Sequence, residues 1–80
     1  MSGTRLDQLI KMINQIAINN PCNGDVAASS EVVLGHIRKF WARPMKKDIV
    51  AHLEQGGEGL EPAALEAVRT LQAEQNMTAS

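Results

Sequence analysis

The chain has 80 residues, with eight lysines and arginines against nine aspartates and glutamates, and a formal net charge of -1. This length allows one domain with a thin hydrophobic core, and the small charge gives no overall field for holding a polyanion. The single cysteine, Cys22, excludes an internal disulfide and favours a reducing compartment. No apolar run reaches the ~18 residues of a membrane span, and residues 1–4 do not begin a signal peptide. We therefore expect one cytoplasmic domain over residues 1–80 that does not enter a membrane.

The first predicted helix begins near Thr4, which can accept an amide hydrogen bond, while Asp7 is placed favourably in the first turn. Apolar residues then recur at helical spacing and form one face, which consists of Leu6, Leu9, Ile10, Ile13, Ile16 and Ala17. Residues 19–24 end this helix, because Pro21 cannot donate a backbone hydrogen bond and Gly24 accepts turn conformations.

A second helix is expected from Asp25 to about Trp41, capped at Asp25 or Ser29. A strand at the two adjacent valines is less favoured, because the polar alternation of a half-buried strand is missing. The apolar face of this helix is predicted to hold Val26, Val33, Ile37 and Phe40, with Leu34 and Trp41 slightly rotated from it.

Pro44 marks a corner, after which a third helix is predicted from Met45 to Gln55, ended by two glycines. Pro62 can open a fourth helix, in which Leu65, Val68 and Leu71 repeat at three-residue spacing. The termini, residues 1–4 and about 75–80, are expected to fray. Because no βαβ alternation is present, the pattern predicts an all-α fold, a small compact bundle of about four short helices.

Candidate ligands and nucleophiles are few. Cys22, His36 and His52 lack the close spacing of a zinc site, and no serine or cysteine lies in a nucleophile motif. Glu58 and Glu61 lie in a Gly-rich connection that would leave them solvated, and this connection lacks the preceding strand and the GK[ST] ending of a phosphate loop. We predict no catalytic residue, cofactor or metal in this chain.

The stretch 36–47 holds both bulky aromatic residues and the whole basic cluster. Adjacent helical positions point about 100° apart, so Phe40 and Trp41 cannot both face one core. Because Phe40 fits the face of Val33 and Ile37, we predict that Trp41 is partly exposed and anchors a protein partner. The alternative is that Trp41 covers a loop and the lysines are only solvated. The candidate partner-binding residues are His36, Arg38, Lys39, Phe40, Trp41, Arg43, Pro44, Met45, Lys46 and Lys47.

This stretch also resembles a known family, the delta subunits of soluble, NAD-dependent, molybdenum-containing formate dehydrogenases. The resemblance rests on His36-Ile37-Arg38-Lys39-Phe40-Trp41, Pro44-Met45-Lys46-Lys47, Ala51-His52-Leu53, Gly56-Gly57-Glu58-Gly59-Leu60 and Met12-Ile13-Asn14-Gln15-Ile16. It extends from about Leu6 to Leu71. One departure is Arg43, since the family usually places its proline second after the tryptophan.

The resemblance implies a non-catalytic accessory subunit that binds the alpha subunit and supports assembly, maturation or stability of a complex that oxidises formate and reduces NAD. It implies that molybdopterin, iron–sulfur clusters and flavin reside in larger subunits, which agrees with the single cysteine here, because clusters need several thiolates. The alternative is a helical nucleic-acid-binding module using the basic stretch 38–47. Three observations argue against nucleic-acid binding. They are the net negative charge, the pI near 6.0 and the lack of base-reading residues at the start of the third helix.

Overall fold

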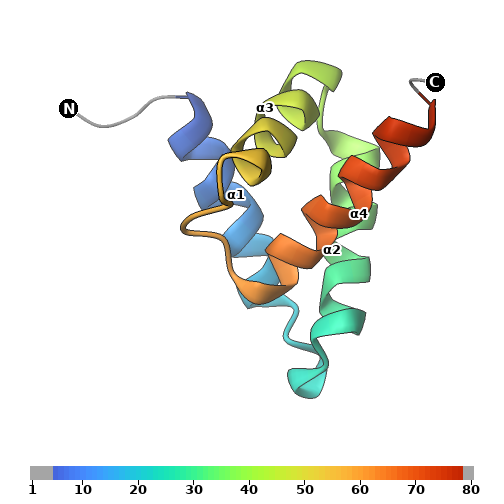
Figure 1. Cartoon of the computed structure of the whole chain (residues 1–80). Coiled ribbons are helices and arrows are strands. Elements are labelled where there is room, and N and C mark those ends of the chain that lie inside the picture. Colours follow the sequence, from blue (N-terminus) through green and yellow to red (C-terminus); the bar gives the residue numbers. More distant parts are fainter. Residues whose placement is uncertain (1–4, 79–80) are drawn as a thin grey trace.

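The computed structural model describes residues 5–78, and these residues form an all-helical fold without strands (Figure 1). The elements are α1 (Arg5–Asn19), the short 3₁₀ turn η1 (Cys22–Gly24), α2 (Val26–Phe40), α3 (Arg43–Glu54) and α4 (Pro62–Thr78). The predicted fold class and the four predicted helices are therefore confirmed.

Local signals set most of the helix ends. The Asp25 carboxylate accepts a hydrogen bond from the amide of Ala28 at 3.2 Å, so Asp25 is the cap of α2. Pro44 lies in the first turn of α3, where its missing N–H leaves no hydrogen bond unmade. α4 continues to Thr78, past the predicted end near Glu74. The predicted cap of the first helix, Thr4, lies outside the described residues.

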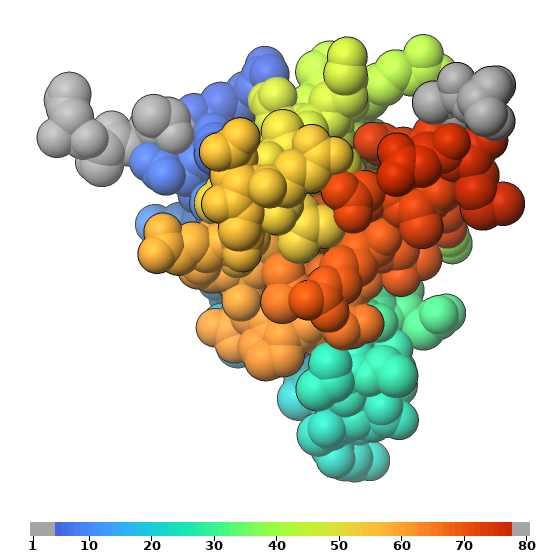
Figure 2. Space-filling model, viewed as in Figure 1, coloured from blue at the N-terminus to red at the C-terminus, as the bar shows by residue number. Residues whose placement is uncertain are grey.

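Helix α2 packs chiefly against α4, and the two helices run in roughly the same direction. Their first turns meet near Ser29 and Ala63, and Arg38 in the last turn of α2 forms an ion pair with Glu74 in the C-terminal half of α4. α1 contacts the other three helices. Figure 2 shows that η1 and the start of α2 extend from the globule as a tip.

The core lies where the four helices meet. Its fully buried side chains are Ile13, Val33, Ile37, Ile49 and Val68. Three buried alanines on α4, at positions 63, 64 and 67, leave room for α2 to approach closely. Val26 was predicted on the apolar face of α2 but is exposed, because it is the first residue of the helix.

Asn14 ties α1 to the connection between α3 and α4. Its Nδ2 donates to the carbonyl of Gly59 at 2.7 Å, and its Oδ1 accepts from the amide of Glu61 at 2.9 Å. One ring nitrogen of His52 lies 2.7 Å from the carbonyl oxygen of Glu58, which holds the same connection from the other side. Side chains of two helices thus fix the Gly-rich segment ahead of α4.

Candidate functional site

The burial of the two adjacent aromatic residues is the reverse of the prediction. Trp41 is 4% exposed and belongs to the core, whereas Phe40 is 70% exposed. The prediction that Trp41 is exposed and Phe40 buried is therefore wrong. Of the two side chains, only that of Phe40 is available at the surface.

The two residues lie at the end of α2, where the helix stops at Phe40 and Trp41 is its C-cap. Four residues of α2 are buried, Ser29, Val33, Leu34 and Ile37, and their mean direction lies close to the line through Val33 and Ile37. At 100° per residue, Phe40 is about 45° from this direction and Trp41 about 55°, so helical spacing alone does not decide which of the two is buried. The backbone of Trp41 is extended, at φ -89° and ψ 133°, as the chain leaves the helix toward α3.

Phe40 belongs to an exposed face on α2 that we call the Phe40 surface, made of Val32, His36, Lys39 and Phe40. Residues 32, 36 and 40 are four apart and therefore lie in line along one side of the helix. The rings of His36 and Phe40 are in contact, with centroids 4.8 Å apart and an interplanar angle of 46°. All four residues are exposed, so apolar area and a cation share this face.

The predicted basic residues divide into two groups. Arg38 forms an ion pair with Glu74, and the Lys46 ammonium lies 3.5 Å from the carbonyl oxygen of Arg38, to which it donates. Within residues 5–78, the exposed side chains of Lys39, Arg43 and Lys47 form no ion pair or hydrogen bond. Three cations at the α2–α3 corner are therefore available to a partner.

The last two predicted site residues, Pro44 and Met45, lie in the first turn of α3, and Cys22, which was not predicted as a site residue, lies in η1. Pro44 is exposed in the first turn of α3, while Met45 is half-buried against the core. Cys22 is half-buried and carries a free thiol. Over the described range, no three His, Cys, Asp or Glu side chains are grouped so that they could hold a metal ion. None of the helices between residues 5 and 78 combines the length and apolarity needed to cross a bilayer.

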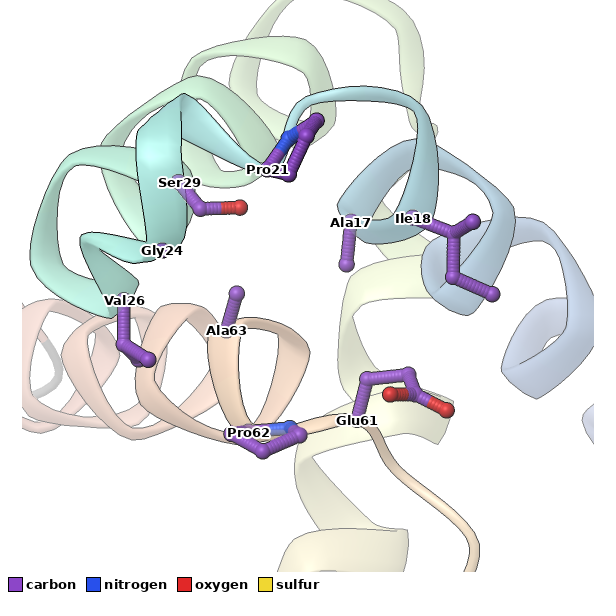
Figure 3. Close-up of a pocket in the computed structure, with 9 residues that line it drawn as sticks. All are labelled: Ala17, Ile18, Pro21, Gly24, Val26, Ser29, Glu61, Pro62 and Ala63. Atoms are coloured by element: carbon purple, nitrogen blue, oxygen red, sulfur yellow. The ribbon is translucent and has the colours of Figure 1, made fainter.

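Besides the buried Trp41 indole, one buried polar residue, Ser29, was not anticipated from the sequence. Ser29 is 3% exposed, and its hydroxyl has no hydrogen-bond partner within the described chain. It lines a pocket of about 150 Å³ between the end of α1 and the first turns of α2 and α4 (Figure 3). Its place four residues before Val33 on the buried face was a signal that could have indicated a serine in the core.

Comparison with protein-family models gives a match over residues 8–68 to the NADH-dependent formate dehydrogenase delta subunit family, FdsD. The chain belongs to this family. The match to the delta subunit family runs from α1 into α4 and includes both the Phe40 surface and Ser29. Searches of curated proteins and of solved structures returned no match. Membership implies partner subunits, because a delta subunit is one component of a larger enzyme.

Proposed function

We propose that this chain is a non-catalytic accessory subunit that binds the alpha subunit of an NAD-dependent formate dehydrogenase in the cytoplasm. In this role it supports assembly, maturation or stability of the complex, and molybdopterin, iron–sulfur clusters, flavin and NAD are bound by the partner subunits. The observation that carries the proposal is the 70% exposed ring of Phe40 on a chain of the delta subunit family.

The Phe40 surface has the chemistry of a protein interface. An aromatic side chain offers large apolar area at a small cost in conformational entropy, and such residues dominate binding energies when a partner buries them. Lys39, Arg43 and Lys47, which have no partner among residues 5–78, suit a polar rim around this anchor. A small domain with a thin core also gains stability from a bound partner by mass action.

The test is to co-express the alpha subunit with Phe40→Ala and to measure recovery of the small subunit and its affinity for the alpha subunit. Truncating an interface anchor costs about 2 kcal/mol or more, which is about 30-fold in affinity. Met12→Ala is the matched control, since Met12 is an exposed apolar residue on α1. Wild-type affinity of Phe40→Ala for the alpha subunit would refute the proposed anchor.

Nucleic-acid binding is the weaker alternative for the basic corner. Two of its cations, Arg38 and Lys46, already have partners inside the protein. Measuring duplex DNA binding at two salt concentrations distinguishes the proposals, because phosphate contacts weaken steeply as salt rises. Tight, salt-sensitive DNA binding together with no affinity for the alpha subunit would favour the alternative.

A further inference from the structure

A pocket opens where the end of α1 meets the first turns of α2 and α4 (Figure 3). Its volume is about 150 Å³, and its walls include the apolar side chains of Ala17, Val26 and Ala63. An engineered apolar cavity of about this volume in another protein holds a benzene molecule. Because this pocket opens to the surface, a ring attached to another chain can enter it, which a closed cavity would not allow.

The Ser29 hydroxyl is the buried polar group in this apolar wall. Figure 3 shows it pointing into the space between α1 and α4. The next residue provides a contrast, because the Ser30 hydroxyl donates to the carbonyl of Ala27 at 2.9 Å, a usual hydrogen bond for a serine in a helix. Leaving a buried hydroxyl unpaired is unfavourable, so the orientation of Ser29 favours a hydrogen bond with a group that enters the pocket.

The mouth of the pocket is mainly apolar, with one acidic residue, Glu61, at its edge. Ile18, Pro21, Val26 and Pro62 line it and are exposed in the isolated chain. The two prolines fix their own φ angles, which restricts the backbone on both sides of the mouth. A mainly apolar hollow with one buried, unpartnered hydroxyl inside and a charged group only at its edge is typical of a site that receives a single anchoring side chain.

We propose that this hollow, here called the Ser29 pocket, receives the phenol ring of a tyrosine from a partner subunit, with the phenol hydroxyl hydrogen-bonded to Ser29 Oγ. A phenol joins a ring of benzene size to one group that both donates and accepts. A phenylalanine ring would leave Ser29 unpaired, and a charged side chain would lose its hydration against apolar walls. The inference rests on the proposed function, since it assumes that a partner subunit is bound.

The first test uses p-cresol and toluene, which differ by the phenol hydroxyl, as probes of the full chain followed by NMR. We expect saturable shifts at Ser29 and Ala63 and tighter binding of p-cresol than of toluene. Ser29→Ala should weaken p-cresol binding about fivefold and leave toluene binding unchanged. Ser30→Ala is the matched control and should bind both probes as wild type does. Equal affinities of wild type and Ser29→Ala for p-cresol, or no saturable shift, would overturn the inference.

The second test uses the assembled enzyme. Val26→Trp places a large side chain at the exposed rim and should block entry, which we expect to lower affinity for the partner subunits about tenfold or more. Ala27→Trp is the control, because Ala27 is exposed on the same turn and does not line the pocket. If Phe40→Ala weakens assembly and Val26→Trp does not, the pocket inference fails and the proposed function stands. If wild type binds no subunit of the enzyme, the proposed function fails, and the p-cresol experiment still decides the chemistry of the pocket.

Discussion

Because Trp41 is buried and Phe40 is exposed, substituting each by alanine should affect the stability of the chain very differently. Trp41→Ala removes a side chain that is 4% exposed. Buried aromatic residues remove about 150–250 Å² from water, which at about 25 cal/mol per Å² corresponds to about 4–6 kcal/mol. A domain of this length has a total unfolding free energy of about 4–12 kcal/mol. Trp41→Ala should therefore remove a large share of the stability of the isolated chain.

The assay is thermal unfolding of the isolated chain followed by circular dichroism. Each kcal/mol shifts the melting temperature of a domain this size by about 4–8 °C, so Trp41→Ala should lower it by about 15 °C or more, or abolish the cooperative transition. Trp41→Phe should cost far less, because it keeps a buried ring and removes an indole N–H that has no partner among the described residues.

Phe40→Ala is the comparison, and it should change the melting temperature by only a few degrees, because the ring of Phe40 is mostly in water. An unchanged melting temperature for Trp41→Ala together with a large fall for Phe40→Ala would refute the reasoning. It would show that Phe40, and not Trp41, contributes to the core.

Four further substitutions can be checked in the same unfolding experiment. Asn14→Ala removes both hydrogen bonds to the α3–α4 connection and should destabilise the chain by about 1–2 kcal/mol; wild-type stability would mean that solvent replaces them fully. Asp25→Ala removes the cap of α2 and should cost about 1 kcal/mol. Gly35→Ala should stabilise α2 by about 0.5–1 kcal/mol, since its added Cβ meets nothing within 4 Å. Gly57→Ala should destabilise by more than about 1 kcal/mol, because φ is +65° and the Cβ would lie 2.9 Å from Leu65 Cδ1; a higher melting temperature would contradict this.

Helix positions were predictable from the sequence because their signals act within a few residues. The cap at Asp25 and the prolines at the starts of α3 and α4 act on their own turn of backbone. The end of α4 was harder to place, because residues 75–77 contain no proline or glycine that would stop a helix. The predicted family was confirmed through motifs spread over most of the chain.

The candidate site was only partly predictable, because it depends on contacts between distant segments. Periodicity identified an apolar face on α2, but Phe40 and Trp41 flank that face at similar angles, and which of them is buried is settled where the chain leaves α2 for α3. The Ser29 pocket requires α1 and α4 to meet α2, and no local pattern contains that information. Whether the predicted basic and aromatic residues contact a partner stays a prediction.

The two hydrogen bonds of Asn14 also bear on the order in which the chain folds. They join residues 45 and 47 positions apart, so they can form only after a long loop has closed. Contacts absent from the folding transition state affect the unfolding rate and leave the folding rate nearly unchanged. We therefore expect Asn14→Ala to accelerate unfolding in stopped-flow denaturant jumps with little effect on refolding. Slower refolding of the variant would instead place the closure of the α3–α4 connection early in folding.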